Sequence, residues 1–304
     1  MSFHIVNIDS PQCSLSCRDG QFVCKTAECE KKLPLEDIAS IIITSFSASI
    51  HSHLILEAAK HGVALIFCEA FKPVSLILPA NRSTDTLLTR ALLRLPEKTR
   101  DQLWAKTVDS KCQNQWTLAQ HIAPDNTALH PLRAAAFGRN PHKEAMCAKM
   151  FWQILSRSLD ETDFVRERTA GGLNNLLNYG YAVLLSTTLQ KLFAVGLDPT
   201  FGLSHVPRER STPLAYDIME PFRPCVDWRV YQWAKQQPKP WVVTKEFRQW
   251  ITGLPLERVG WLDCTWEIQG VIEGVVRGLR RALLEKQPRY YKPWIPRNSK
   301  WAGL

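Results

Sequence analysis

The 304-residue chain lacks the long apolar run that a membrane span would need. No apolar stretch approaches the roughly 20 residues that cross a bilayer, and the N-terminus lacks the charged-then-apolar order of a signal peptide. The composition, 45% hydrophobic and 22% charged, is that of a globular protein. We therefore expect a cytoplasmic protein without membrane contact, built of two domains or of one large domain.

The motifs of several common enzyme classes are also absent. The chain contains no Walker loop, no dinucleotide fingerprint and no Gly-x-Ser-x-Gly elbow. The first two motifs bind the phosphates of nucleotides, and the third exposes a nucleophilic serine. A nucleotide-fuelled reaction and serine hydrolysis are therefore disfavoured.

The nine cysteines include no pair with the Cys-x-x-Cys spacing of a zinc knuckle. Four of them, Cys13, Cys17, Cys24 and Cys29, cluster around an expected hairpin. We favour free thiols in a reducing compartment, and a zinc site is the alternative.

Acidic residues are scarce at the C-terminal end. Residues 277–304 contain eight lysines and arginines against the single Glu285, so +7 of the formal net charge of +9 lies there. Four aromatic residues are interspersed with these charges, namely Tyr290, Tyr291, Trp294 and Trp301. Such a mixture is typical of a nucleic-acid surface, with Arg277, Arg280 and Arg281 as DNA-binding candidates. A solvated basic tail with its aromatic rings packed on the body is an equal alternative.

Residues 1–80 are predicted to form a small β-rich domain around one helix. The apolar periodicity of residues 49–61 predicts that helix, ended by Gly62. The Asp19-Gly20 pair is a strong hairpin signal. Short β-branched or alternating runs predict strands at residues 3–8, 14–17, 22–26, 38–44, 63–68 and 74–78.

Residues 81–86 are predicted to be a linker because they are small and polar, and residues 87–304 are predicted to be helical. The fold class is therefore α+β, a small N-terminal β-rich domain followed by a larger all-α domain. The segment from Pro124 to Pro141 is polar and broken, and it offers Arg139 as a DNA-binding cation. Helices are expected at residues 87–95, 97–121, 143–152, 173–185, 226–233, 244–251 and 266–286, and one begins at 213.

The helix over residues 97–121 is expected to be amphipathic. Its buried face is predicted to carry Leu103, Trp104, Val108 and Trp116. Its solvent face is predicted to carry Lys106, Lys111 and Gln115.

A helix start followed by two acids lies in the C-terminal half of the chain. Ser211 or Thr212 suits the N-cap, and Pro213 suits the first helical position. Asp217 and Glu220 then share one face, three residues apart, among apolar neighbours. Carboxylates in such surroundings need a positive partner.

Two kinds of partner are open for these acids. One is a divalent metal shared with His205, since two carboxylates and an imidazole suit Mg²⁺ or Mn²⁺ and their phosphodiester chemistry. The other is an ion pair with an arginine, for which the candidates are Arg208, Arg210 and Arg223.

Two further features bear on this site. Glu144 lies on the face that its helix should bury, either for chemistry or as a first-turn acid favoured by the helix dipole. Pro221 lacks an N–H and crowds the carbonyl of Asp217, so the helix should bend or end there and help to aim Glu220.

A polar seam crosses another apolar helix, formed by Asn174, Asn178 and Tyr181 at i, i+4 and i+7. Such a seam hydrogen-bonds helix to helix or orients a neighbouring site. We assign Asn178 to that supporting role.

Several of these segments, in order, resemble the family of CRISPR-associated protein one, the integrase of CRISPR adaptation. The motifs are Leu35-Glu36-Asp37-Ile38, Lys143-Glu144-Ala145, Asn178-Tyr179-Gly180-Tyr181, Gly196-Leu197-Asp198-Pro199 running to His205, and Tyr216 to Pro224. The resemblance implies a β-rich front domain that serves dimerisation and partner docking, and a helical catalytic domain.

The resemblance also implies roles for individual residues. Glu144, His205 and Glu220 match the family's catalytic metal ligands, with Mg²⁺ or Mn²⁺ as the cofactor. Asp217 matches an acid that supports the site, and Lys143 stands where a phosphate contact is expected.

The activity implied is the joining of the 3′-OH of short DNA fragments to the repeat of a CRISPR array. The implied partners are double-stranded and branched DNA, a second copy in a homodimer, and CRISPR-associated protein two. The family is also described as a metal-dependent endonuclease on branched DNA. The rival hypotheses are a branched-DNA nuclease of repair and a DNA-binding scaffold without catalysis.

Overall fold

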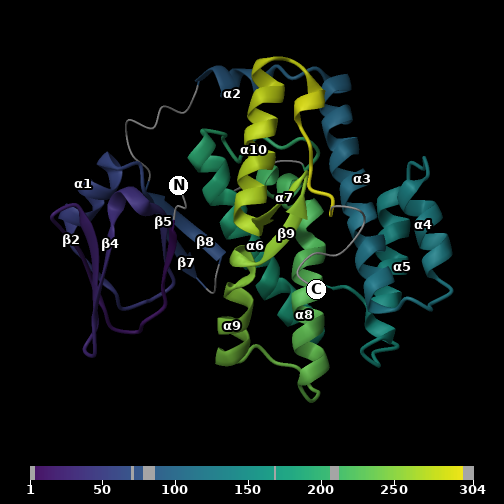
Figure 1. Cartoon of the computed structure of the whole chain (residues 1–304), viewed down its shortest axis with the longest axis horizontal. Helices are drawn as coiled ribbons and strands as arrows, with labels where there is room; N and C mark the ends of the chain where they lie inside the picture. The colour runs from purple at the N-terminus through teal and green to yellow at the C-terminus, as the bar shows by residue number, and fades with distance from the viewer. Residues whose placement is uncertain (1–3, 70–71, 78–85, 168, 206–211, 297–304) are drawn as a thin grey trace. The chain divides into compact units, whose positions relative to one another are not determined.

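The computed structural model describes residues 4–69, 72–77, 86–167, 169–205 and 212–296 (Figure 1). Two compact units make up the chain, Met1–Thr86 and Leu87–Leu304. The first is rich in strands and the second is mainly helical, so the predicted fold class is confirmed. No helix among the described residues combines the length and the apolarity that a membrane crossing needs.

Two four-stranded sheets and one short helix form the N-terminal unit. The first sheet has the strand order β1-β5-β7-β8, in which β8 runs antiparallel and the other pairs are parallel. The second has the order β4-β3-β2-β6. The bounds are β1 His4–Ile8, β2 Ser14–Arg18, β3 Gln21–Lys25, β4 Glu30–Pro34, η1 Leu35–Asp37, β5 Ile38–Ile43, β6 Ser49–Ile50, α1 Ser52–Lys60, β7 Ala64–Glu69 and β8 Lys72–Ile77.

The Asp19-Gly20 pair forms the predicted tight turn between β2 and β3. Both residues have positive φ, 50° and 73°, which the two-residue hairpin geometry requires. The next strand, β4, was not predicted. It begins with Glu30-Lys31-Lys32, and these exposed charges suit the edge of a sheet but hide the strand from an apolar pattern.

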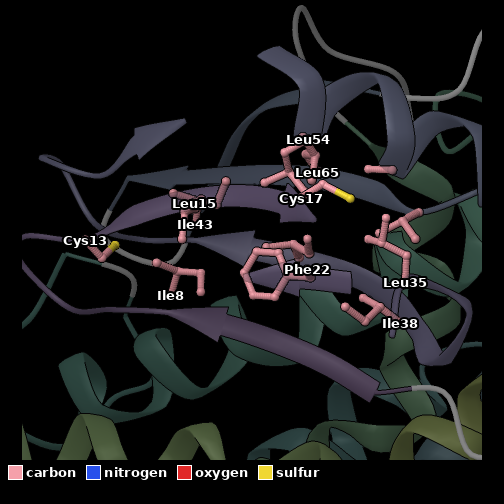
Figure 2. Close-up of a cluster of buried hydrophobic side chains, with 13 residues drawn as sticks. Ile8, Cys13, Leu15, Cys17, Phe22, Leu35, Ile38, Ile43, Leu54 and Leu65 are labelled. Carbon is pink, nitrogen blue, oxygen red and sulfur yellow. The ribbon is translucent and has the colours of Figure 1, made fainter. Parts of the chain in front are cut away.

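Two clusters of buried apolar side chains lie among the described residues of the N-terminal unit, a small one of Ile42, Ile66 and Cys68 and the large one drawn in Figure 2. Phe22 lies at its centre in Figure 2, and Leu15, Leu35, Leu54 and Leu65 around it are completely or almost completely buried. Two of the four clustered cysteines, Cys13 and Cys17, belong to this core, while Cys24 is partly buried and Cys29 is exposed. All four are free thiols.

Helix α6 is the central element of the C-terminal unit, and it packs against α7, α8, α9 and α10. Its Gly180 allows the close approach of α8, since a Cβ there would lie 2.4 Å from Val226 Cγ1. Helix α3 packs against α4, α5 and α8. The bounds are α2 Thr86–Leu93, α3 Glu97–Ile122, α4 Leu129–Phe137, α5 Lys143–Arg157, α6 Leu173–Val195, α7 Pro213–Met219, η2 Glu220–Phe222, α8 Arg223–Gln236, α9 Lys245–Thr252, η3 Leu254–Leu256, β9 Arg258–Trp261, β10 Cys264–Glu267, α10 Ile268–Leu284 and η4 Pro288–Tyr290.

Two elements of this unit were not predicted. Helix α4 occupies the segment expected to be broken, because Pro131 falls in the first turn, where its missing N–H has no helical partner in any case. A two-stranded hairpin, β9 with β10, precedes α10. Trp266 therefore lies in a strand, and the last long helix begins at Ile268 rather than at Trp266.

Candidate metal centre

Lys111 connects the two glutamates that the sequence singled out. Its Nζ lies 2.6 Å from Glu144 Oε1 and 2.6 Å from Glu220 Oε2. The three side chains come from the middle of α3, the first turn of α5 and the turn η2. Glu144 and Glu220, remote in sequence, are thereby held against one positive charge.

Glu220 is buried, and two cations keep it ionised. Arg223 Nε lies 2.8 Å from its Oε1 and Lys111 Nζ lies 2.6 Å from its Oε2, and both contacts are ion pairs without the alignment of a hydrogen bond. Burial acts to raise the pKa of Glu220, but Arg223 and Lys111 outweigh burial, so the pKa is lowered. Burial likewise acts to lower the pKa of Lys111, and the two glutamates outweigh it, so this pKa is raised.

Asp217 orients the imidazole ring of His205. The distance between His205 Nδ1 and Asp217 Oδ1 is 2.6 Å, and the carboxylate also accepts hydrogen bonds from the backbone N–H groups of Leu203, Ser204 and His205. The hydrogen bond to Asp217 raises the pKa of His205, against the effect of burial, and the charge of Glu220 adds to the rise.

The backbone before α7 is fitted closely to this pair. At Gly202 a Cβ would lie 2.7 Å from His205 O and 2.9 Å from Asp217 Oδ2, so only glycine leaves room for the turn. Thr212 occupies the N-cap position without a side-chain hydrogen bond, and Pro213 takes the first helical position as predicted. Ser211, Arg208 and Arg210 lie outside the described residues.

Pro221 interrupts the α-helix, as predicted. Helix α7 ends at Met219, Glu220–Phe222 form a 3₁₀ turn, and α8 begins at Arg223. The Pro221 carbonyl accepts a hydrogen bond of 2.7 Å from Asn114 Nδ2. Of the predicted arginine partners, Arg223 does pair with Glu220.

The prediction for the solvent face of α3 was wrong, whereas Leu103 of the predicted buried face is buried. The side chain of Lys111 is only 12% exposed, Gln115 is buried, and Lys106 donates to the carbonyls of Pro288 and Tyr291. Helix α3 is covered on several sides, so polar side chains point inward wherever they find partners. Lys111 is therefore the residue in contact with both glutamates that the sequence analysis assigned to solvent. The available signal was a second inward stripe of polar residues, Thr107, Ser110, Lys111 and Asn114.

The C-terminal segment, residues 288–296, supplies hydrogen-bond partners for several polar side chains of α3. Thr107 Oγ1 lies 2.8 Å from the Tyr291 hydroxyl, and Asn114 Nδ2 donates to the Trp294 carbonyl at 2.9 Å. Tyr291 and Trp294 are fully buried, and Trp294 stacks on Phe222 with ring centroids 5.5 Å apart. For these two aromatic residues, packing on the body is the correct interpretation. Trp301 lies outside the described residues.

The polar seam of α6 leads to Arg223 through a buried tyrosine. Arg166 donates to the side-chain oxygens of Asn174 and Asn178, at 2.8 Å and 2.7 Å, and its guanidinium lies 5.4 Å from the Tyr181 ring. The guanidinium of Arg223 lies 4.7 Å from the same ring.

The hydroxyl of Tyr181 donates to Asp227, which the sequence analysis did not single out. Burial raises the pKa of Asp227 to about 7, although Tyr181 and Arg223 oppose the rise. The seam therefore ends at a third buried carboxyl group, besides those of Asp217 and Glu220.

The predicted DNA-binding cations differ in their surroundings. Lys143 is buried, with its ammonium against Asp109, and Arg139 is exposed in the turn before α5. Arg277 and Arg281 are exposed on α10, each paired with a glutamate of the same helix, and the Arg281 guanidinium also lies 3.8 Å from the Tyr290 ring. Arg280 is half-buried.

The donors available here suit a hard divalent cation. Among the described residues no three His, Cys, Asp or Glu side chains are gathered closely enough to hold a metal ion, because Lys111 stands between Glu144 and Glu220. Yet Glu220 Oε2 is a buried oxygen with no hydrogen bond, and carboxylate oxygens are the donors that Mg²⁺ and Mn²⁺ prefer. The chemistry of the donor set therefore fits such an ion.

Comparison with known proteins identifies the family. A model of the family described as CRISPR associated protein Cas1 matches residues 6–248. The CRISPR-associated endonuclease Cas1 of Neisseria meningitidis serogroup C (strain 8013) is 33% identical over 210 residues, which cover 67% of each chain. The chain belongs to the Cas1 family, which confirms the resemblance of its motifs and the prediction of an enzyme.

Solved structures share the fold across nearly the whole chain. A casposase bound to an integration product matches with a TM-score of 0.68 and 21% identity, covering 94% of this chain and 91% of that one. A chain of a partial Cas6-RT-Cas1--Cas2 complex matches with a TM-score of 0.68 and 14% identity, covering 97% and 99%. At these identities the likeness shows the fold alone.

Proposed function

We propose that this Cas1-family enzyme joins the 3′-OH of short DNA fragments to the repeat of a CRISPR array by metal-dependent transesterification, and that it also cleaves branched DNA. The observation that carries the proposal is the convergence of Glu144 and Glu220 on one cation. The charge of Glu220 also acts to raise the pKa of His205. The family supports a nuclease or integrase, and the fold shared with a casposase bound to an integration product supports strand transfer.

In this proposal Glu144, His205 and Glu220 hold Mg²⁺ or Mn²⁺. The bound metal would polarise a phosphoryl oxygen of the scissile bond and stabilise charge in the displacement. Asp217 holds His205 through Nδ1, which leaves Nε2 as the ligating nitrogen. Arg223 contacts Oε1 of Glu220, and Oε2, which contacts Lys111, is the oxygen that would bind the metal. Asn178 supports Arg166 and, through the Tyr181 ring, Arg223.

The proposed partners are double-stranded and branched DNA, a second copy of the chain, and CRISPR-associated protein two. The matched complex that contains Cas1 and Cas2 supports the last of these. Arg139, Arg277, Arg280 and Arg281 are the proposed cations for DNA, and Lys143 is a weaker candidate because Asp109 already binds it. We place the reaction in the cytoplasm.

Strand transfer tests this function directly. A labelled fragment with a free 3′-OH is incubated with a supercoiled plasmid carrying the leader and repeat, the small partner protein and Mn²⁺ or Mg²⁺. Wild type should yield joined product, and the yield from Glu220→Ala should be at least about 100-fold lower. Cleavage of branched DNA without any joined product would favour the repair nuclease. Binding of DNA with neither activity would favour the scaffold.

A further inference from the structure

The Lys111 ammonium is placed as a metal ion would be. It lies between carboxylate oxygens of two separate segments, 2.6 Å from each, and its side chain is only 12% exposed. Its contact with Glu220 Oε2 is an ion pair without the alignment of a hydrogen bond. Toward Glu220 the attraction is therefore one of charge, which another cation can replace, whereas Lys111 also donates a hydrogen bond of 2.6 Å to Glu144 Oε1.

The charges of this cluster already balance without a metal. Glu144 and Glu220 contribute two negative charges, and Lys111 and Arg223 contribute two positive ones. A divalent cation added beside both basic groups would leave two uncompensated positive charges in a mostly buried site. Like charges a few ångströms apart repel strongly where water is excluded, so one of the two basic groups must give way.

Of the two basic groups, Lys111 has the more flexible side chain. Arg223 is held at the start of α8 against the ring of Tyr181, and its planar guanidinium has little freedom there. The lysine ammonium ends a flexible four-carbon stem. Its other partner, Glu144, is 39% exposed, so this side of the pair meets solvent.

We propose that Lys111 is an internal substitute for the metal, which neutralises Glu144 and Glu220 in the metal-free enzyme and must swing away before the metal binds, so that it sets the metal affinity. This inference rests on the proposed function, since it assigns Lys111 to the same site. It makes Lys111 a positioning residue that competes with the cofactor rather than a ligand.

Calorimetric titration of the full-length, chelator-treated protein with Mn²⁺, without DNA, tests the inference. Lys111→Met keeps the length of the side chain and removes its charge. The variant should bind Mn²⁺ at least about tenfold more tightly than wild type because the competing cation is gone. Its thermal midpoint in EDTA should fall by several degrees, since two carboxylates face each other unpaired, and Mn²⁺ should restore it.

Two control variants separate competition from packing. Lys111→Arg retains the charge and should keep the wild-type Mn²⁺ affinity. Lys191→Met removes the charge of another buried lysine, one paired with Glu273, and should lower stability equally with and without Mn²⁺. Equal or weaker Mn²⁺ binding by Lys111→Met would overturn the inference while leaving the metal site standing. Absence of Mn²⁺ binding in wild type and variant alike would overturn both.

Discussion

The Nδ1 atom of His205 lies 2.6 Å from Oδ1 of Asp217, and the same carboxylate is held by backbone N–H groups on either side of Ser204. One buried acid thus fixes both the ring of the proposed ligand and the loop that carries it. This arrangement makes the metal affinity depend on a residue that need not touch the metal.

Asp217→Asn should weaken Mn²⁺ binding by about 10- to 100-fold, because the amide cannot hold the same tautomer of His205. Titration calorimetry measures the affinity, and circular dichroism checks that the variant is folded. Wild-type affinity in a folded variant would remove Asp217 from its supporting role.

Gly202→Ala should destabilise the protein by roughly 1–3 kcal/mol and loosen the His205 loop, since its Cβ would enter the space of Asp217 Oδ2 and two other atoms. Gly270→Ala is the matched control, because a Cβ there meets nothing within 4 Å and the residue lies inside α10. Urea unfolding should show a loss for the first variant and a slight gain for the second. Equal effects would contradict the close packing.

Pro221→Ala should leave the protein folded and lower strand transfer by about tenfold, because a restored N–H lets the α-helix continue through the turn that carries Glu220. Activity relative to wild type at saturating Mn²⁺ is the measurement. Full activity would show that the 3₁₀ turn does not aim the carboxylate.

Asp227 should make the metal-free protein less stable as the pH rises. Its pKa of about 7 lies above the value of an unfolded aspartate, so the folded state holds the extra proton between about pH 4 and 7. Stability from the neutral carboxyl is therefore lost as the pH rises through 7. Between pH 5 and pH 8 in EDTA, the unfolding free energy of Asp227→Asn should fall by roughly 1–3 kcal/mol less than that of wild type. An unchanged slope would contradict the raised pKa.

The triple variant Arg277→Ala, Arg280→Ala, Arg281→Ala should bind DNA more weakly and with a salt dependence reduced by about two to three units of slope. The pairs of Arg277 and Arg281 with glutamates of their own helix are exposed and weak, so they leave these cations available to phosphates. A charge-matched change at Lys235, Lys245 and Arg248 serves as the control. An unchanged slope in the α10 variant would assign these arginines to solvent.

The parts of the site that could be predicted are those whose residues lie close together in the sequence. Pro213 marks a helix start, and Asp217, Glu220 and Pro221 follow within one or two turns, so local rules place them together. Glu144 stood out only as an acid on an inward face, and its role came from the resemblance. The Asp19-Gly20 turn was predictable for the same local reason.

The pairing of Lys111 with two glutamates could not be predicted, because these partners are distant in the chain and its helix is covered on several sides. Amphipathic reasoning assumes one solvent face, and α3 has polar groups that find carbonyls and carboxylates inside the fold. The β9-β10 hairpin escaped detection because its strands are short and β10 is largely exposed.

Asn114 connects the C-terminal segment to the turn that carries Glu220. Its single amide group donates both to Pro221, in the turn that carries Glu220, and to Trp294. Ending the chain before Pro288 would remove hydrogen-bond partners of Lys106, Thr107 and Asn114. Their polar atoms would then be left without these partners in the interior. A chain shortened in this way would loosen the turn that carries Glu220.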